Sequence, residues 1–276
     1  PELEAALEKL RSDVQYSLLP RDTTEDRDAI IEIRAGTGGD EASLFAGDLL
    51  RMYQRFAEER GWRFEHLESS PSDVGGFKEV VCRIAGEEVF RFLKYEGGVH
   101  RVQRVPATET QGRIHTSTAT VAVMPEAEEV DIEIRPEDLR IEVCRSGGAG
   151  GQHVNKTESA VQIWHIPTGV YVRCEEERSQ MKNREKGMKI LRAKLFEAKK
   201  REEAEKYSAA RRNLIGSGGR EEKIRTYNFP QNRLTDHRIG YTSHNLDGIL
   251  LGQMEDLIMA LQHAEMQERL AEAGMS

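Results

Sequence analysis

A run of small residues from Gly147 to Gly151 constrains the fold of this 276-residue chain more than any other feature. The run, GGAGG, leads directly into Gln152 and His153. Glycine has no Cβ, so it can adopt positive φ and bring bare backbone close to another molecule, although ordering it is entropically costly. The run is therefore either a flexible tether or a loop that presents backbone to a partner. Linkers are usually Gly/Ser tracts, whereas this run ends in QHVNK, so we favour a loop that presents Gln152.

The overall composition is typical of a soluble protein, with 38% hydrophobic and 32% charged residues. The length allows two or three domains, each with its own core. No apolar run approaches the length of a membrane span, and we expect no membrane partner. The three cysteines, Cys82, Cys144 and Cys174, are far apart and form no CxxC pair, so we expect neither a disulfide framework nor a bound metal. A reducing cytoplasm is the expected location.

Charge is segregated along the chain. The net charge is −8, yet residues 173–225 hold 17 Lys and Arg against 10 Asp and Glu, a local charge of +7. A basic segment on an acidic chain indicates local contact with phosphates. The alternative is a solvated helix with ion pairs between residues four apart, which Glu202 and Lys206 fit. The glycine loop nearby in the sequence favours the phosphate interpretation.

Hydrophobic periodicity predicts an α+β fold with boundaries near residues 134 and 223. Helices are expected at 1–18, from the glycine-rich turn through Phe56 to Gly61, at 179–212 and from 250 to about 273, with a helical turn at 89–93. Strands are expected at 30–33, 64–67, 80–84, 99–105, 114–123, 130–134, 139–143, 161–164 and 170–172, and a loop and strand at 227–238. The chain begins with Pro1, so we expect the first helix to be the remnant of a longer segment.

Two further segments carry polar groups that could bind a ligand. The turn at 36–41, GTGGDE, lies between a predicted strand and helix, where phosphates often bind, but it lacks the GK[ST] of a P-loop. Taken alone, it is explained by Asp40 capping the helix.

The segment 97–118 alternates valine with polar residues, and Pro106 ends the strand so that Ala107 and Thr108 form an exposed tip. Hydroxyls and imidazoles there suit recognition of single-stranded RNA, although an ordinary threonine-rich strand is also possible.

Gln152 cannot act as a general acid or base, because its side chain does not titrate. Its role must be positioning, or stabilising developing charge through N–H donors. The sequence contains no HExxH, no GxSxG and no convincing nucleophile–histidine pair. We therefore expect this loop to be half of an active site that a larger partner completes.

The chain resembles the bacterial class I peptide chain release factors, of the release factor 1 type, from about residue 28 to its C-terminus. The matching segments are Gly36–Ser43, Gly97–Ser117, Arg145–Thr157, Glu177–Gln180 and Arg225–Arg238. The resemblance implies a codon-recognition α/β sandwich-like domain and a smaller α+β domain that carries the Gly-Gly-Gln loop and the long basic helix. The implied domains are a remnant of an N-terminal helical domain (1–22), the codon-recognition domain (23–134), the catalytic-loop domain (135–222) and a C-terminal domain packed on the codon-recognition domain (223–276).

The resemblance also implies which stop codons are recognised. The tripeptide Pro106-Ala107-Thr108 matches the Pro-x-Thr pattern of factors that recognise UAA and UAG, whereas the Ser-Pro-Phe of the sister family is absent. By this analogy Thr108 and Glu41 meet the first base, and the backbone of Gly38 packs close to it.

The same analogy assigns three residues to the second and third bases. His115 stacks beneath the second base, and Gln103 and Thr116 meet the third. Glutamine and threonine both donate and accept hydrogen bonds, so they can satisfy either adenine or guanine.

Gly150, Gly151 and Gln152 match the family's catalytic triplet at the peptidyl transferase centre. The resemblance implies hydrolysis of the peptidyl-tRNA ester in the P site, promoted only as part of the ribosomal active site and without a cofactor. The backbone N–H of Gln152 would stabilise the transition state, and its side chain would admit water and is a target of N5-methylation.

The implied partners are the ribosome at its decoding site and peptidyl transferase centre, the mRNA stop codon, the P-site peptidyl-tRNA and a glutamine methyltransferase. A class II release factor GTPase is a further implied partner, one that depends on the N-terminal domain.

A ribosome-rescue hydrolase would share the Gly-Gly-Gln loop but lack the segment 97–117 and carry a basic tail, whereas residues 264–276 hold three glutamates. A non-catalytic RNA-binding protein would explain the basic helix but not Gln152.

Overall fold

The computed structural model describes residues 24–106, 109–127, 134–145, 159–216 and 218–274. The predicted helix at 1–18 lies outside these residues, as does nearly all of the predicted strand at 130–134. The chain divides into two compact units, unit 1 (residues 1–126 and 209–276) and unit 2 (residues 127–208). Unit 1 is thus built from two separate segments of the sequence.

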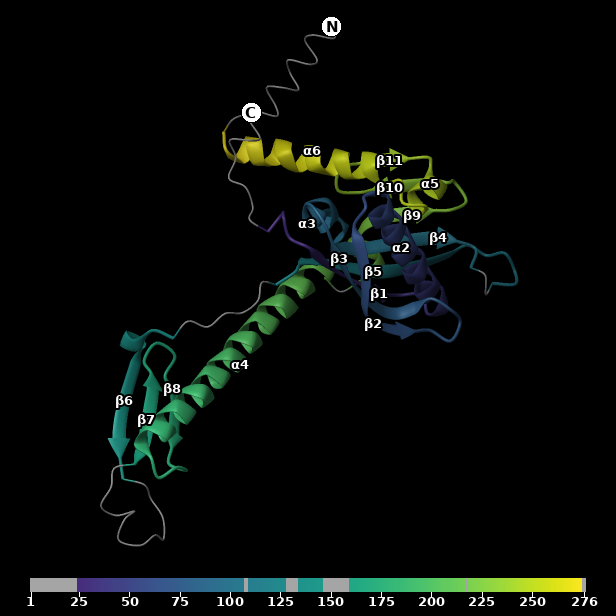
Figure 1. Ribbon diagram of the computed structural model, residues 1–276. Helices are drawn as coiled ribbons and strands as arrows, with labels where there is room; N and C mark the ends of the chain where they lie inside the picture. The colour runs from purple at the N-terminus through teal and green to yellow at the C-terminus, as the bar shows by residue number, and fades with distance from the viewer. Residues whose placement is uncertain (1–23, 107–108, 128–133, 146–158, 217, 275–276) are drawn as a thin grey trace. The chain divides into compact units, whose positions relative to one another are not determined.

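Unit 1 contains an eight-stranded sheet in the order β11-β10-β9-β4-β5-β1-β3-β2 (Figure 1). Its strands are β1 (Ala29–Ala35), β2 (Arg63–Pro71), β3 (Phe77–Ala85), β4 (Gly98–Arg104), β5 (His115–Pro125), β9 (Lys223–Asn228), β10 (Arg233–Asp236) and β11 (Tyr241–Ser243). β4 and β9 pair in parallel, and the other neighbouring strands pair antiparallel. The five strands predicted between residues 30 and 123 are confirmed. Strand β4 therefore lies inside the sheet, with partners on both edges.

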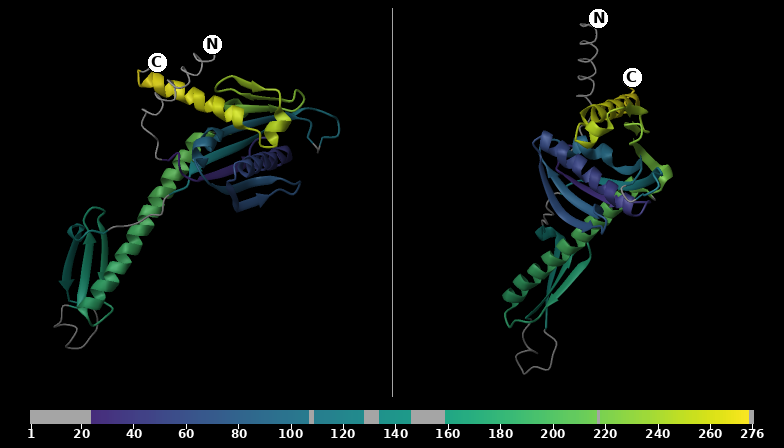
Figure 2. Two further views of the ribbon diagram at one scale, coloured as in Figure 1. Left: turned by 45° about the horizontal axis from the view of Figure 1, so that its top comes forward. Right: turned by 90° about the vertical axis from the view of Figure 1, so that its right-hand side faces the viewer.

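One hydrophobic core joins this sheet to four helices, α2 (Asp40–Glu59), α3 (Val89–Leu93), α5 (Leu246–Leu250) and α6 (Glu255–Glu272). Helix α2 lies against one face of the sheet (Figure 2) and buries Phe45, Leu49 and Phe56 there. It ends at Glu59, and Gly61 follows with a φ of 70°, so the predicted end at this glycine is confirmed. Short 3-10 turns complete the unit at η1 (Lys94–Glu96) and η3 (Arg220–Glu222).

The C-terminal helix predicted from 250 to about 273 is confirmed as α6, but it begins five residues later than predicted, and the short helix α5 before it was not predicted. Helix α5 ends at Leu250 and α6 begins at Glu255. Between them Gly252 has a φ of 104°, and a Cβ on it would lie 2.8 Å from the backbone nitrogen of Phe56. The glycine lets the turn approach the backbone of α2, a tertiary requirement that helical periodicity does not reveal.

Unit 2 contains a three-stranded antiparallel sheet, β6 (Leu139–Cys144), β7 (Ala160–His165) and β8 (Val170–Cys174), preceded by the turn η2 (Pro136–Asp138). Helix α4 (Gln180–Ile215) packs Leu191 and Leu195 against this sheet. The predicted strands and the long helix are confirmed, although α4 runs three residues beyond the predicted end. The two units together confirm a multidomain α+β fold.

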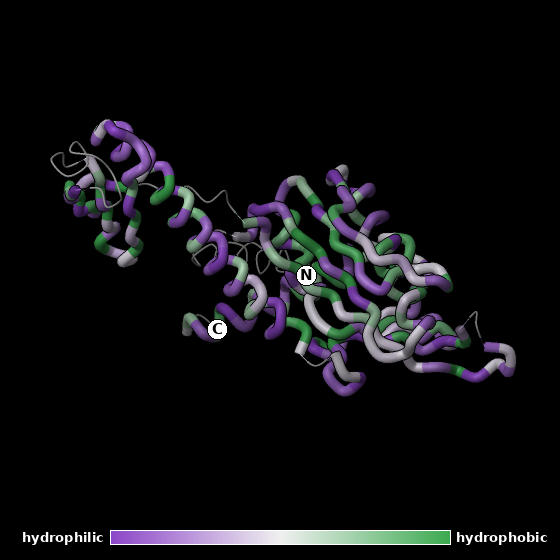
Figure 3. The backbone as a smooth tube through the Cα atoms, turned by 90° about the horizontal axis from the view of Figure 1, so that it is seen from below, coloured by the Kyte–Doolittle hydropathy of each residue, from purple (hydrophilic) through white to green (hydrophobic). Residues whose placement is uncertain are grey.

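Hydropathy differs between these elements. In Figure 3 the elements of unit 1 carry long hydrophobic stretches, whereas hydrophilic residues predominate along α4. In its 36 residues, α4 buries only Asn183, Gly187, Leu191 and Leu195. Gly187 allows close packing, since a Cβ there would lie 2.9 Å from Cδ1 of Ile163.

A fully buried charge network fixes β9 within unit 1. Both Nη atoms of Arg225 donate to the carboxylate of Glu96, at 2.6 and 2.8 Å, and Nε of Arg225 donates to Asp236 at 3.2 Å. The hydroxyl of Tyr53, on α2, donates to Glu96 at 2.9 Å. Burial raises the pKa of Glu96, but Arg225 outweighs this effect and holds it below its ordinary value. The network thus joins α2, η1, β9 and β10 beside strand β4.

His100 on β4 lies fully buried next to this network, and the fold holds it neutral. Its Nε2 contacts the carbonyl oxygen of Glu96 at 2.9 Å and must donate, so its Nδ1 accepts from the hydroxyl of Tyr227 at 3.0 Å. Burial, followed by the charge of Arg225, lowers the pKa of His100 from 6.5 to about 4. Because the folded state resists protonation, this contribution to stability is complete above pH 6.5 and is lost as the pH falls toward 4.

We therefore expect the free energy of unfolding of the wild type to fall, between pH 7 and pH 5, by about 2 kcal/mol more than that of His100→Gln. Glutamine can donate and accept at the same place but does not titrate. Urea unfolding of both proteins at the two pH values measures the difference. Identical pH dependence in the two proteins would show that His100 titrates normally in the fold.

Candidate functional site

The ends of β4 and β5 bring two expected recognition residues directly opposite each other. Gln103 pairs with Thr116 across the antiparallel ladder, and Arg104 pairs with His115. On the other edge of β4, Asn228 donates through Nδ2 to Oε1 of Gln103 at 3.2 Å. The side-chain amide of Gln103 is therefore oriented, with its oxygen engaged by Asn228.

The loop before α2 packs against the start of β5. Gly38 has a φ of 137°, and a Cβ on it would lie 2.3 Å from Oγ of Ser117, the neighbour of Thr116. The loop is tied down by Thr118, whose hydroxyl accepts from the amide of Thr37 at 2.8 Å. Gly38 is thus held against Ser117, the residue after Thr116, at a position that excludes any side chain. The prediction that Asp40 caps this helix is wrong. The N-cap of α2 is Gly39, no side chain caps the helix, and Asp40 lies in its first turn.

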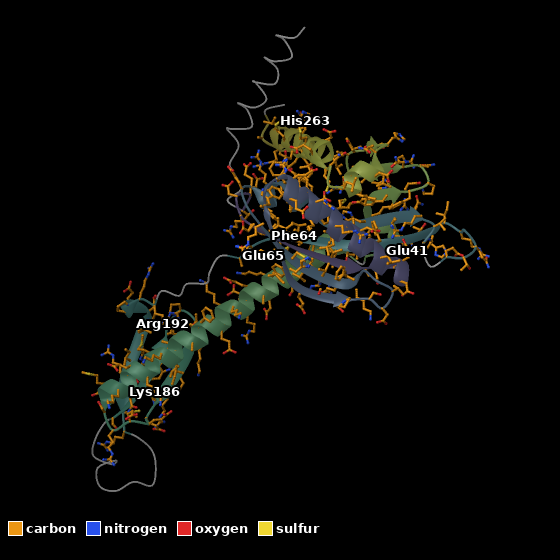
Figure 4. The ribbon with its side chains drawn as sticks, turned by 45° about the vertical axis from the view of Figure 1, so that its right-hand side comes forward. Glu41, Phe64, Glu65, Lys186, Arg192 and His263 are labelled. Atoms are coloured by element: carbon orange, nitrogen blue, oxygen red, sulfur yellow. The ribbon has the colours of Figure 1, made fainter. Side chains whose placement is uncertain are left out.

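Glu41 is almost completely buried at the start of α2 (labelled in Figure 4), with its side chain 4% exposed. Its Oε1 accepts a hydrogen bond from Nε of Arg104. Its Oε2 is buried and has no hydrogen-bond partner among the described residues. Buried carboxylate oxygens are nearly always paired, so an oxygen without a described partner makes Glu41 a candidate for contact with a ligand.

Arg104, at the last position of β4, holds Glu41 in place. Its Nη1 donates to Asp48 at 2.6 Å, and its guanidinium carbon lies 5.0 Å from the ring centroid of Phe229. Burial works against the charge, but Asp48 and Glu41 outweigh it and hold the pKa of Arg104 above its ordinary value. The arginine therefore stays charged and fixes both its own strand end and the carboxylate of Glu41.

His115 begins β5 with an exposed ring that is held by a carboxylate. Its Nε2 lies 2.6 Å from Oε2 of Glu109, while Oε1 of Glu109 accepts from the amide of Gln111 at 2.7 Å. These two bonds, the amide bond first, lower the pKa of Glu109. The ionised carboxylate can only accept, so Nε2 of His115 carries the proton. The amide of Glu109 in turn donates to the carbonyl of Pro106, which is buried, at 3.0 Å.

Five predicted site residues lie outside the described residues: Ala107, Thr108, Gly150, Gly151 and Gln152. The described residues do fix the two strands that flank the Gly-Gly-Gln segment, because Cys144 and Ala160 are opposite each other on β6 and β7. Asn183, fully buried on α4, donates to the carbonyls of Ser159 and Glu177 at 2.8 and 2.7 Å and accepts from the amide of Glu177 at 2.9 Å. Asn183 thus fastens the returning end of the loop to the segment before α4.

Four residues that hold the predicted site or its flanking segments in place were missed from the sequence: Arg104, Asp48, Glu109 and Asn183. One signal for the first two was available, because Glu41 and Asp48 are seven residues apart and share one face of the predicted helix. Two carboxylates on a helix face that packs against a core favour a cation nearby, and Arg104 follows at the end of a predicted strand. No comparable sequence pattern indicated Glu109 or Asn183.

Two negative findings apply to the described part of the chain. None of its helices combines the length and apolar character that crossing a bilayer requires. Its histidines, cysteines and acidic residues form no group of three or more that could hold a metal ion.

Comparison with known proteins identifies the class of protein to which this fold and site correspond. Residues 1–121 match the PCRF domain and residues 128–238 match the RF-1 domain. Peptide chain release factor 1 of Akkermansia muciniphila is 99% identical over the whole chain, which covers 77% of that protein. Peptide chain release factor 1 of Carboxydothermus hydrogenoformans is 56% identical, over 98% of this chain and 75% of that protein.

A solved structure agrees with these relatives. RF2 of Thermus thermophilus matches with a TM-score of 0.56 and 40% identity, over 95% of this chain and 75% of that one. The chain therefore belongs to the peptide chain release factor 1 family.

Proposed function

We propose that this chain recognises UAA and UAG in the ribosomal decoding site and promotes hydrolysis of the peptidyl-tRNA ester. Its family makes it a stop-codon-recognising translation termination factor. The observation that carries the finer proposal is the pairing of Gln103 with Thr116 at the ends of β4 and β5, next to Arg104, which holds Glu41 at the start of α2. The Pro106-Ala107-Thr108 tripeptide begins two residues after the end of β4.

The orientation of Gln103 supports recognition of a purine at the third position. Asn228 engages its oxygen, so the amide Nε2 of Gln103 remains to donate to a base. Adenine and guanine both present N7 as an acceptor on the same edge, whereas pyrimidines do not. The hydroxyl of Thr116, on the paired position, can rotate to donate or accept. This pair tolerates both purines, as UAA and UAG require.

The buried carboxylate of Glu41 supports recognition of uracil at the first position. Uracil has an N3–H that can donate to Oε2, whereas cytosine has only an acceptor at N3. The amides at the start of α2, unpaired within the helix, can donate to a uracil carbonyl. A cytosine would set its N3 acceptor against the acceptor Oε2, whereas uracil would supply the donor that Oε2 lacks, which favours uracil. Thr108 is proposed to meet the same base, and the exposed ring of His115 to stack beneath the second base.

Hydrolysis is assigned to Gly150, Gly151 and Gln152, with the ribosome supplying the rest of the active site. The backbone N–H of Gln152 would stabilise charge that develops in the transition state, and N5-methylation of its side chain by a glutamine methyltransferase would add apolar bulk. The P-site peptidyl-tRNA is the substrate, and a class II GTPase is a further proposed partner. We assign codon recognition to residues 23–134, supported by residues 223–276, and the catalytic loop to residues 135–222.

Peptide release from purified ribosomes tests this proposal. Ribosomes hold labelled peptidyl-tRNA in the P site, with UAA, UAG, UGA or the sense codon CAA in the A site. We expect release on UAA and UAG, and at most background release on UGA and CAA. Release on every codon would point to a rescue hydrolase, and binding without release would remove the hydrolytic role of the chain.

Arg104→Lys is expected to weaken first-base recognition without slowing the chemical step. Lysine cannot bridge Glu41 and Asp48 with a planar fork, so Oε2 of Glu41 loses its fixed position. We expect kcat/KM for release on UAA to fall about tenfold, while the rate at saturating factor changes less than about twofold. The ratio of kcat/KM on UAA to kcat/KM on CAA, which measures first-base discrimination, should also fall.

The matched control is Arg51→Lys, because Arg51 contacts the same Asp48 from an exposed position. It should leave kcat/KM within about twofold of the wild type. Equal effects of the two substitutions, or a loss confined to the saturating rate, would contradict a positioning role for Arg104.

A further inference from the structure

A row of polar residues on the sheet of unit 1 continues past the predicted recognition pair. Strands β5, β4, β9 and β10 are neighbours in this sheet (Figure 1), and Thr116 on β5 lies opposite Gln103 on β4. On the other edge of β4, Gln103 lies opposite Asn228, and Asn228 lies opposite Arg233 on β10. Arg101, two residues before Gln103, lies on the same face of the sheet. Neighbouring strands are about 4.8 Å apart, so the backbone of Arg233 is roughly 10 Å beyond that of Gln103.

Arg101 and Arg233 differ from the other arginines at this end of the sheet, because they have no acidic partner. Arg104, Arg225 and Arg238 each contact a carboxylate. Arg101 and Arg233 are half-buried, and within the described residues the Nε atom of each is buried without a hydrogen-bond partner. Burial lowers the pKa of Arg101, and no carboxylate acts in the opposite direction. A buried donor without an acceptor is costly, so the two arginines indicate a site for a negatively charged ligand.

The surroundings of Arg101 are positively charged as well. Burial, followed by the charges of Lys223 and Arg101, lowers the pKa of His237, which follows the end of β10. Asp236 acts in the opposite direction, but its carboxylate is held by two other arginines. This end of the sheet therefore presents positive charge that the neighbouring acidic residue does not neutralise.

The alternative is that these arginines are ordinary solvated residues of a sheet surface. Arg63, on the same face of the sheet in the edge strand β2, fits that description, because its side chain is 76% exposed and pairs with Glu65. Arg101 and Arg233 are less exposed and have no such partner among the described residues. Solvation therefore explains them less well than a ligand does.

An RNA phosphate is the anion that suits this place. A guanidinium can bind two phosphate oxygens through parallel N–H groups. Under the proposed function the first base meets Glu41 on α2, which packs on the core face of the sheet, and the third base meets Gln103 on the other face. The RNA strand thus crosses the ends of β4 and β5, and its next nucleotides continue toward Asn228 and Arg233.

We infer that Arg101 and Arg233 bind backbone phosphates of the mRNA on the 3′ side of the stop codon. The chain then holds the mRNA beyond the three bases that it recognises. The inference rests on the proposed function, which places the third base at Gln103. It concerns how strongly the mRNA is held and not which codon is recognised, so release specific to UAA and UAG can be confirmed even when this contact fails.

Peptide release on two mRNAs tests the inference. Both place UAA in the A site, but one mRNA ends at the third base of the codon and the other continues for about six nucleotides. We expect kcat/KM of the wild type to be about tenfold higher on the longer mRNA. The variant Arg101→Gln with Arg233→Gln should lose that advantage, yet match the wild type within about twofold on the shorter mRNA. Urea unfolding of the variant establishes that it is folded.

Two controls identify the phosphates as the ligand. Arg63→Gln removes a charge from the same face of the sheet and should keep the full dependence on mRNA length. Uncharged methylphosphonate linkages in place of the first two phosphates after the codon should lower kcat/KM of the wild type about as much as truncation does, without affecting the variant. A wild type that does not respond to mRNA length or to the uncharged linkages would overturn the inference. So would a folded variant that is equally impaired on both mRNAs, because its arginines would then contact ribosomal RNA.

Discussion

Replacing Gly151 with alanine is expected to slow peptide release at saturating factor by about 100-fold or more, the cost of losing one backbone donor to a developing oxyanion. The added Cβ restricts positive φ and obstructs close approach of the backbone that precedes Gln152. The measurement is single-turnover release on UAA-programmed ribosomes, with binding of the factor measured separately.

The matched control is Gly147→Ala, the same chemical change at the far end of the glycine run. It should slow release less than about fivefold, because its backbone is not assigned to the reacting centre. Gln152→Ala should bind terminating ribosomes with nearly normal affinity, since the proposed role of this residue lies in hydrolysis. Normal release by Gly151→Ala, or a large loss of affinity in Gln152→Ala, would contradict this division of roles.

Replacing Arg225 with methionine is expected to destabilise unit 1 by about 3–5 kcal/mol, because it leaves the carboxylate of Glu96 buried without its cation. Arg225 and Glu96 are both completely buried, so solvent does not screen the loss. The measurement is urea unfolding followed by the fluorescence of Trp62, in a Trp164→Phe background so that the signal comes from unit 1.

The exposed pair of Arg63 and Glu65 offers a control, since Arg63 is 76% exposed. Arg63→Gln should change stability by less than about 1 kcal/mol. Adding Glu96→Gln to Arg225→Met should restore part of the lost stability, because the uncompensated charge is removed. A loss below about 1 kcal/mol in Arg225→Met alone would show that the network does not anchor β9.

Much of the local structure could be predicted because it depends on short-range patterns. Alternating valines located β4, and Gly61 located the end of α2. The parallel pairing of β4 with β9 could not be predicted, since Gln103 and Asn228 are 125 residues apart and no local pattern links them. Gly252 was missed as a helix boundary for the same reason, because its role depends on the approach to α2.

In the predicted recognition site, too, contacts between residues far apart in the sequence could not be predicted. Gln103, Thr116 and Gly38 were assigned through resemblance. The strand register places Gln103 opposite Thr116, whereas Gly38 packs against Ser117, the next residue of β5. The burial of Glu41 was not predicted, because it depends on Arg104 from another element. Sequence spacing identifies residues within one helix or strand, whereas the partner that orients a side chain usually comes from elsewhere.

The parallel pairing of β4 and β9 also has a consequence for how the protein is made. About 120 residues, including all of unit 2, must be synthesised after β4 before β9 appears. At typical elongation rates of about 5–20 residues per second, the edge of β4 stays unpaired on the nascent chain for roughly 6 to 24 seconds. An open strand edge is prone to wrong pairing during that time. A factor that ends the synthesis of other chains thus completes its own sheet only after the whole of unit 2 has been synthesised.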